Sequence, residues 1–244
     1  MAIDSKHVIL TGGSGLLGKE IQKRLPDILA PSHDEFDIEN FEAMDAWISK
    51  NDVSALIHAA AYTSPPKAEQ EPMKAMSANI IGTANVVRVC HKHDLRVVYL
   101  STDYVFKGDT GNYSEGDNLN PQNLYAWSKL GGECAVKMYE KSLIVRTSFC
   151  EPVFPYEKAF ADQYTSRDSV DVIASMILDV ALNETISGVI HVGTERKTVK
   201  ELAVKLGKTD VEDLLRDEVS FNVPYDTSLN LDKFNSVKNK ESKS

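Results

Sequence analysis

Near its start, the chain carries a glycine-rich turn that leaves few folds open to it. The segment TGGSGLLG at residues 11–18 follows a short apolar strand pattern at residues 7–10 and opens a helical pattern over residues 15–25. Glycines between a first strand and a first helix let the backbone approach a pyrophosphate closely, and the helix start presents unpaired N–H groups to it. Glycine clusters elsewhere often form turns only, but this position favours dinucleotide binding.

Strand-like and helix-like patterns alternate along the rest of the chain, which is typical of a parallel sheet covered by helices on both faces. We expect strands at residues 7–10, 28–31, 55–58, 96–100, 142–146 and 188–192, and helices at residues 15–25, 41–50, 72–93, 125–139, 170–182 and 199–206. The predicted class is therefore α/β, a Rossmann-type doubly wound and mainly parallel sheet with a small C-terminal substrate-binding lobe.

The same patterns of strands and helices divide the chain into a cofactor-binding core and a small lobe. We assign residues 1–149 to the NAD(P)-binding core, continued by about 168–195, and residues 150–167 and 196–244 to the small lobe. The segment 151–167 is irregular and aromatic, as expected of a part that faces substrate. Residues 236–244 are polar and are expected to form a frayed tail.

The net charge and the cysteine content of the chain limit the kinds of partner that it is expected to bind. The 27 Lys and Arg against 36 Asp and Glu leave a formal net charge of −9, which argues against a general nucleic-acid or anionic-membrane surface. No apolar run approaches the roughly 20 residues of a membrane span, and the start has no signal-peptide layout. Cys90, Cys134 and Cys150 lie far apart without metal-ligand spacing, so we expect no metal site and a cytoplasmic protein.

A tyrosine and a lysine four residues apart suggest acid–base chemistry. Tyr125 and Lys129 lie on one face of the helix predicted at residues 125–139, so both can reach one site. A free tyrosine has a pKa of about 10, and a nearby cation lowers that value. Because Thr102 follows the strand predicted at residues 96–100, at the edge where open α/β sheets bind ligands, we expect it to hydrogen-bond a substrate carbonyl.

The spacing Gly12-x-x-Gly15-x-x-Gly18 resembles the TGxxGxxG fingerprint of short-chain dehydrogenases, which use NADP or NAD and tyrosine chemistry. No Asp or Glu closes the predicted second strand, where NAD-specific enzymes often hold the ribose hydroxyls. Because Ser32 and His33 stand there instead, we expect NADPH to be accepted at least as well as NADH, with residues 34–35 (Asp-Glu) close enough to keep the choice open.

Several longer stretches resemble one family, the dTDP-4-dehydrorhamnose reductases of the extended short-chain dehydrogenase/reductase superfamily. They are AAYT (60–63), KAE (67–69), NIIGT (79–83), STDYVF (101–106), YAWSKLGGE (125–133) and PYDTSLN (224–230). The resemblance also places residues 37–38 at the adenine ring, although Asp37 could equally cap the next helix. The expected cofactor contacts are Gly12, Gly15, Leu16, Leu17, Gly18, Ser32, His33, Asp37, Ile38, Ala59, Ala60, Ala61, Tyr125 and Lys129.

The resemblance implies a reaction and a substrate class. A hydride would pass from the nicotinamide to C4 of a 4-keto-6-deoxy sugar carried on a nucleoside diphosphate, with Tyr125 as proton donor and Thr102 orienting the keto oxygen. Lys129 would complete the catalytic set, and a homodimer is one candidate assembly. The expected contacts to the nucleotide sugar are Asp103, Tyr104 and Ser148.

Three departures from the family pattern leave the substrate open. Residues 64–66 (Ser-Pro-Pro) replace the usual small-Val-Asp, the interval between residues 148 and 170 is short, and Val223 stands where an arginine is common. A nucleotide-sugar epimerase or dehydratase is one alternative, although Tyr104 after Asp103 breaks the acidic pair that a dehydratase uses. A non-catalytic, cofactor-binding subunit that resembles the methionine adenosyltransferase β subunit is another.

Overall fold

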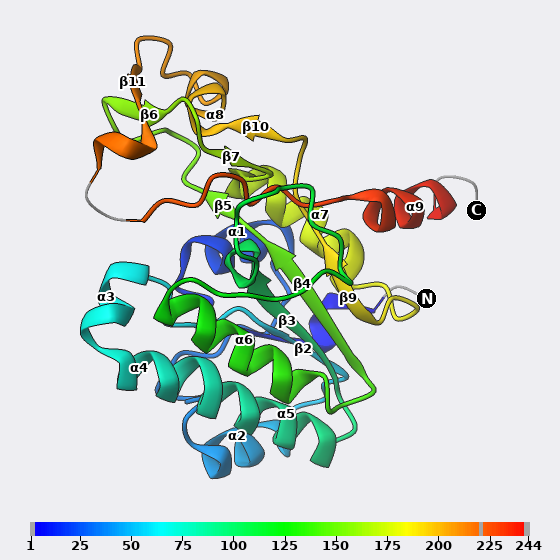
Figure 1. Ribbon diagram of the computed structural model, residues 1–244. Helices are drawn as coiled ribbons and strands as arrows, with labels where there is room; N and C mark the ends of the chain where they lie inside the picture. Colours follow the sequence, from blue (N-terminus) through cyan, green and yellow to red (C-terminus); the bar gives the residue numbers. More distant parts are fainter. Residues whose placement is uncertain (1–2, 220–221, 242–244) are drawn as a thin grey trace.

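The computed structural model describes residues 3–219 and 222–241 (Figure 1). Its centre is a five-stranded sheet of order β1-β2-β3-β4-β9 in which every neighbouring pair runs parallel. The strands are β1 (Val8–Thr11), β2 (Ala55–His58), β3 (Arg96–Thr102), β4 (Ser142–Thr147) and β9 (Gly188–His191). The predicted α/β class with a mainly parallel sheet is confirmed.

Helices cover both faces of the sheet, which explains why successive residues in the middle of each strand are apolar. In β1, Val8 and Leu10 belong to the core on one face and Ile9 to the core on the other, because successive strand side chains point to opposite faces. Figure 1 shows α1 and α7 on one face and α2, α5 and α6 on the other. These helices are α1 (Leu16–Arg24), α2 (Phe41–Ile48), α5 (Thr83–Lys92), α6 (Leu124–Val136) and α7 (Val170–Ala181).

The predicted second strand is reduced to one bridged residue pair, Ile9 with Leu29. The backbone of Leu29 still exchanges hydrogen bonds with Val8 and Leu10, so this segment occupies the strand position beside β1. Pro31 cannot donate a ladder hydrogen bond, which explains why pairing stops there. The chain then crosses to β2 on the other side of β1, which makes the end of β1 a topological switch point.

The helix predicted over residues 72–93 is one continuous helical run with a wider middle turn. It comprises α4 (Pro72–Met76), the π-helical segment η2 (Ser77–Gly82) and α5. The short α3 (Pro65–Gln70) precedes it and was not predicted; its Ser64 side chain accepts from Lys67 N, and Pro65 occupies the first helical position. In the described ranges 3–219 and 222–241, no helix has both the length and the apolarity to cross a bilayer.

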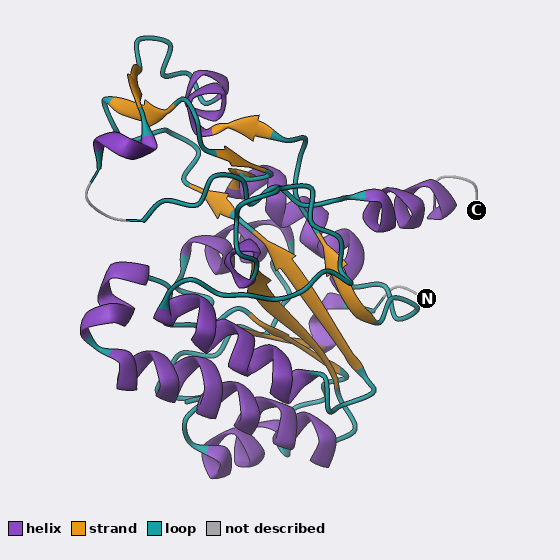
Figure 2. Cartoon of the chain, viewed as in Figure 1, coloured by secondary structure: helices purple, strands orange, loops and turns teal. Residues whose placement is uncertain are grey.

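Short elements and long loops gather beyond the carboxyl ends of the strands (Figure 2). Three two-stranded pairs form there: β5 (Phe149–Cys150) with β8 (Asp168–Ser169), β6 (Lys158–Phe160) with β11 (Glu212–Leu214), and β7 (Tyr164–Thr165) with β10 (Lys197–Thr198). The helix α8 (Val199–Lys205) begins with a capping box between Thr198 and Glu201. The small 3-10 segments are η1 (Ser5–His7), η3 (Asp103–Val105) and η4 (Arg216–Glu218).

The C-terminal part returns to the core. A strap of residues 226–230 lies along residues 108–113, with hydrogen bonds from Asp226 N to Gly108 O (2.9 Å) and from Asn230 N to Tyr113 O (2.7 Å). The helix α9 (Asp232–Glu241) follows and buries Phe234 in the core beside α7. The frayed tail predicted at residues 236–244 is therefore wrong over its described part, because the apolar Phe234 anchors a helix; residues 242–244 lie outside the described residues.

Candidate active site

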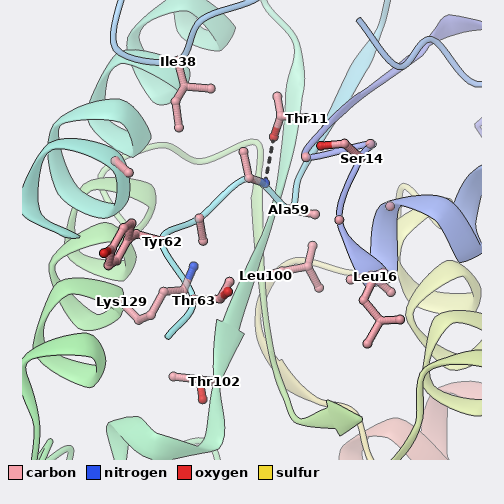
Figure 3. A pocket seen from close by; sticks show the side chains of 18 of the residues that line it. Thr11, Ser14, Leu16, Ile38, Ala59, Tyr62, Thr63, Leu100, Thr102 and Lys129 are labelled. Carbon is pink, nitrogen blue, oxygen red and sulfur yellow. Dashed lines mark hydrogen bonds between the residues drawn. The ribbon is translucent and has the colours of Figure 1, made fainter. Parts of the chain in front are cut away.

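A cavity of about 1260 Å³ opens at the carboxyl end of the sheet, beside the switch point. Loops that follow β1, β2, β3 and β4 line it, which is where open α/β sheets bind ligands. Figure 3 shows Ile38 at one end and Thr102 at the other, with Lys129 reaching in from α6 and Leu16 facing it across the cavity. The cavity therefore joins the glycine-rich turn to the predicted catalytic residues.

Two glycines of the turn are required by its packing, and a third keeps the cavity open. A Cβ on Gly12, whose φ is +76°, would lie 2.6 Å from Ala60 N, and one on Gly18 would lie 2.2 Å from Gly12 O. A Cβ on Gly15 would meet only Gly12 O, at 3.3 Å. Gly15 caps α1 without a side-chain hydrogen bond, so the first amides of the helix remain available to a phosphate. The cradle fits a dinucleotide pyrophosphate.

A Gly15→Leu variant should fold and lose dinucleotide binding. The new side chain meets little protein but fills the space where a pyrophosphate approaches the backbone. We expect affinity for NADH and NADPH to fall at least about tenfold, or roughly 1.4 kcal/mol, in a calorimetric titration. Gly116→Leu is the matched control, because a Cβ there has nothing within 4 Å and Gly116 lies outside the cavity. Unchanged affinity in Gly15→Leu would remove the turn from the binding site.

A buried histidine ties the turn to the loop after β2. The Thr11 hydroxyl accepts from Ala60 N (3.2 Å) and shares a 2.8 Å hydrogen bond with His58 Nδ1, whose Nε2 lies 3.1 Å from the Thr83 hydroxyl. Burial, with the charge of Lys129, lowers the pKa of His58 to about 3, so the ring is neutral. The sequence did not single out His58, because a lone strand histidine has no distinguishing spacing. Its contacts hold residues 59–61 against the cavity.

Thr102 and Tyr125 meet at the far end of the cavity. The Thr102 hydroxyl donates to Asp103 Oδ1 (3.1 Å) and accepts from Tyr104 N (3.2 Å). Burial raises the pKa of the Tyr125 phenol and the charge of Asp103 adds to this, whereas its hydrogen bond with Thr102 and the charge of Arg167 act in the opposite sense. The phenol is therefore protonated at neutral pH, so it carries a proton that it can donate. The lowering of its pKa by a nearby cation, expected from the spacing of Tyr125 and Lys129, is outweighed by burial.

Lys129 enters the same cavity from α6. Its side chain is 3% exposed, and its ammonium lies 4.1 Å from the centre of the Tyr99 ring, which provides a cation–π contact in place of a carboxylate. Burial lowers the pKa of Lys129 to about 7, and the charge of Glu133 opposes that change. Among the described residues, no side chain forms an ion pair with this ammonium, so it is available to a ligand.

A buried ion pair fixes α6 against the sheet beneath the site. Glu133 and Arg146, 0% and 1% exposed, form two hydrogen bonds of 2.9 and 2.8 Å, and the Ser101 hydroxyl donates to Glu133 at 2.6 Å. A buried pair of this kind has little net worth for stability, but removal of one partner leaves an uncompensated charge. Its effect here is positional, because it joins β3 and β4 to the helix that carries Tyr125 and Lys129.

Asn79, from the π-helical segment, holds the loop after β2. Its side-chain oxygen accepts from Tyr62 N (2.8 Å), and its amide donates to Tyr62 O (3.0 Å) and to the Ser128 hydroxyl (2.8 Å). Asn79 is 1% exposed, so these contacts satisfy a buried polar group. The wider helical turn thereby positions the part of the loop that lines the cavity next to α6.

The predicted substrate contacts lie together at the catalytic end. Asp103, Tyr104 and Ser148 all line the cavity. Asp103 is 2% exposed, burial raises its pKa, and the Thr227 hydroxyl donates to its Oδ2 at 2.8 Å. Arg167, which the sequence did not single out, also lines the cavity and donates from Nε to the Ser148 hydroxyl at 2.9 Å. A single arginine in an irregular segment carries no local signal.

The cavity brings together all the predicted site residues except one. Asp37 does not line it; its carboxylate accepts from Glu39 N at 2.9 Å and so caps its own turn. Of the three departures from the family pattern, Pro65 lines the cavity and Val223 does not. The predicted residues that line the cavity are Gly12, Gly15, Leu16, Leu17, Gly18, Ser32, His33, Ile38, Ala59, Ala60, Ala61, Thr102, Asp103, Tyr104, Tyr125, Lys129 and Ser148.

A parallel sheet with its glycine-rich turn at the switch point, and a Thr/Tyr/Lys set at the other end of one cavity, define a dinucleotide-binding enzyme of the Rossmann class. The model of the RmlD substrate binding domain matches residues 6–157. The dTDP-4-dehydrorhamnose reductase of Aggregatibacter actinomycetemcomitans is 33% identical over 210 residues, covering 82% of this chain and 71% of that enzyme. The chain belongs to the dTDP-4-dehydrorhamnose reductase family.

Two further comparisons support this. The Mycobacterium tuberculosis (strain H37Rv) dTDP-4-dehydrorhamnose reductase is 35% identical over 159 residues, which cover 61% of this chain and 52% of that enzyme. The chain therefore spans about half the length of this relative. The crystal structure of the Bacillus anthracis dTDP-4-dehydrorhamnose reductase in complex with NADP superposes with a TM-score of 0.84 at 29% identity, covering 94% of this chain and 90% of that one.

Proposed function

We propose that this chain is an NAD(P)H-dependent reductase that transfers a hydride to C4 of a nucleoside-diphosphate 4-keto-6-deoxy sugar. The observation that carries the proposal is the meeting of Thr102, Tyr125 and Lys129 at one end of a cavity whose other parts fit a dinucleotide. An epimerase or dehydratase is less well supported, because Tyr104 occupies the position beside Asp103 that an acidic partner would take. A regulatory subunit would have no use for Thr102, Tyr125 and Lys129 lining one cavity.

The residues of the chain perform separate tasks in this reaction. The cofactor, when bound, supplies the hydride. The turn at residues 12–18 holds its pyrophosphate, and the Lys129 ammonium binds the ribose next to the nicotinamide. Thr102 orients the substrate keto oxygen by a hydrogen bond, and Tyr125 donates its phenolic proton to the oxygen as negative charge develops there. Asp103, Tyr104 and Ser148 contact the sugar.

Charge at the catalytic end suits an anionic substrate. The Arg167 guanidinium donates from Nε to the Ser148 hydroxyl. Its backbone is held by a hydrogen bond from its N to Thr165 Oγ1 (3.0 Å) and by one from Lys197 Nζ to its O (3.1 Å). A guanidinium oriented by Ser148 beside the sugar site offers a partner to a diphosphate, a task that Val223 cannot perform. This supports a nucleotide sugar in place of a free sugar.

The setting of the enzyme is part of the proposal. We place it in the cytoplasm, where its three unpaired cysteines stay reduced.

We propose a homodimer that covers the large apolar side chains exposed on α4, η2 and α6, which are Met73, Met76, Ile81, Leu124 and Trp127. We also propose that residues 1–149 with about 168–195 form the cofactor-binding core and that residues 150–167 and 196–230 form the substrate lobe. The lobe expected from sequence over 196–244 does not extend through α9, because that helix buries Phe234 in the core beside α7.

A direct assay tests the function. Purified protein is mixed with NADH or NADPH and a panel of nucleoside-diphosphate 4-keto-6-deoxy sugars, and loss of reduced-cofactor absorbance is followed. We expect oxidation of the cofactor with at least one member of the panel and a product reduced at C4. Free sugars without the diphosphate serve as the control and should react poorly. Cofactor binding without hydride transfer across the whole panel would favour the regulatory subunit.

A further inference from the structure

The end of the cavity opposite Thr102 is closed by a turn that follows the segment beside β1. In this turn Glu35 N and Phe36 N both donate to Ser32 O, at 3.2 and 3.0 Å. In Rossmann folds the ribose of the adenosine lies at the end of the strand next to β1, and an acidic side chain there binds its 2′-hydroxyl. Ser32, His33 and Glu35 line this part of the cavity.

Glu35 folds back onto the start of its own turn. Its Oε2 accepts from Ser32 N at 2.9 Å and from the Ser32 hydroxyl at 2.7 Å. These hydrogen bonds lower the pKa of Glu35, so the carboxylate is charged at neutral pH. An anion thus already occupies the two donors that a 2′-phosphate would use. In the part of the chain that the structure describes, its other oxygen accepts no protein hydrogen bond and can accept one from a ribose hydroxyl.

The charged side chains around Glu35 also disfavour the binding of a 2′-phosphate. Glu39 also lines this end, whereas Lys129 and Arg167, the Lys and Arg side chains that line the described cavity, lie at the catalytic end. NADP-binding sites of this fold commonly hold the 2′-phosphate with an arginine. Here the phosphate would meet two carboxylates and the exposed ring of His33, which lies 4.0 Å from Asp37.

We infer that Glu35 determines the cofactor preference of this chain: it accepts from the ribose 2′-hydroxyl of NADH and repels the 2′-phosphate of NADPH. From the sequence we expected NADPH to be accepted at least as well as NADH, with residues 34–35 leaving the choice open; the turn brings the Glu35 carboxylate to this end of the cavity. The inference concerns dinucleotide binding and does not depend on which sugar is reduced.

Replacing Glu35 by the isosteric but neutral glutamine tests this inference about cofactor preference. Glu35→Gln keeps an oxygen that can accept from Ser32, and Asp34→Asn removes the same charge one residue earlier, from an exposed side chain outside the cavity. Dissociation constants of NADH and NADPH are measured by calorimetry without any sugar. We expect wild type to bind NADH more tightly, and Glu35→Gln to shift the ratio of the two constants towards NADPH by about tenfold or more. Asp34→Asn should leave the ratio unchanged within about twofold.

Three results would overturn the inference: an unchanged ratio in Glu35→Gln, an equal shift in Asp34→Asn, or tighter binding of NADPH by wild type. Glu35→Ala, which frees the Ser32 donors, should shift the ratio in the same direction as Glu35→Gln and guards against a local effect of the new amide. Because no substrate is present, the test separates the two proposals. If the ratio shifts as expected but no keto sugar is reduced, the reductase assignment fails and the role of Glu35 stands.

Discussion

Replacement of Tyr125 by phenylalanine should lower turnover by a factor on the order of a hundred or more, which is the range for loss of a general acid. The change keeps the ring and removes the hydroxyl that would donate the proton. Cofactor affinity should stay within about twofold, because the glycine-rich turn lies elsewhere in the cavity. The measurement is single-turnover hydride transfer to a 4-keto-6-deoxy nucleotide sugar.

A second tyrosine provides the control for this experiment. Tyr156 is 66% exposed and lies outside the cavity, so Tyr156→Phe removes a phenol without touching the site. Its transfer rate should equal that of wild type. Equal rates in wild type and Tyr125→Phe would show that the proton comes from another group, and the protonated phenol would then have no catalytic task.

Replacement of Lys129 by methionine should abolish most activity and at the same time stabilise the fold. The folded-state pKa of about 7 lies below the ordinary value of 10.5, so burial of the ammonium costs free energy. That cost is present in full below pH 7 and is lost as the pH rises from 7 to 10.5; above 10.5 the lysine is neutral in both the folded and the unfolded state. Each pKa unit is worth about 1.4 kcal/mol, so we expect a gain of a few kcal/mol at pH 7 after loss of the Tyr99 contact.

Urea unfolding of the cofactor-free protein at pH 7 and pH 10 measures this gain. The difference in unfolding free energy between Lys129→Met and wild type should be large at pH 7 and smaller at pH 10. Lys137→Met, at an exposed position at the end of the same helix, should change neither value. A less stable Lys129→Met protein at pH 7 would contradict the view that the lysine is retained for function at a cost in stability.

The parts of the site that could be predicted from the sequence are those with a local pattern. The glycine spacing at residues 12–18, the Tyr125/Lys129 pair and Thr102 at a strand end each combine a residue type with a fixed interval, and the structure brings all of them to one cavity. The strands were predictable because both of their faces are buried, so each is an apolar run bounded by turn residues.

What could not be predicted depends on contacts between distant residues or on the geometry of one turn. Arg146 and Glu133 pair across two elements without a common motif, and Arg167 reaches the cavity from an irregular segment. In NAD-binding Rossmann folds an acidic residue is expected at the end of the second strand. Glu35 lies further along the chain, and only the folding of its turn brings its carboxylate back to that end of the cavity. Asp37, which was expected at the adenine ring, does not line the cavity; its carboxylate accepts a hydrogen bond within its own turn.

The strap at residues 226–230 ties the sugar end of the site to the last part of the chain. Asp103 receives a hydrogen bond from Thr227, a partner 124 residues later in the chain. During synthesis, β1 to β4 leave the ribosome before that partner exists, and the buried Asp103 carboxylate lacks this hydroxyl donor until the strap is in place. We therefore expect the sugar end of the site to be completed last.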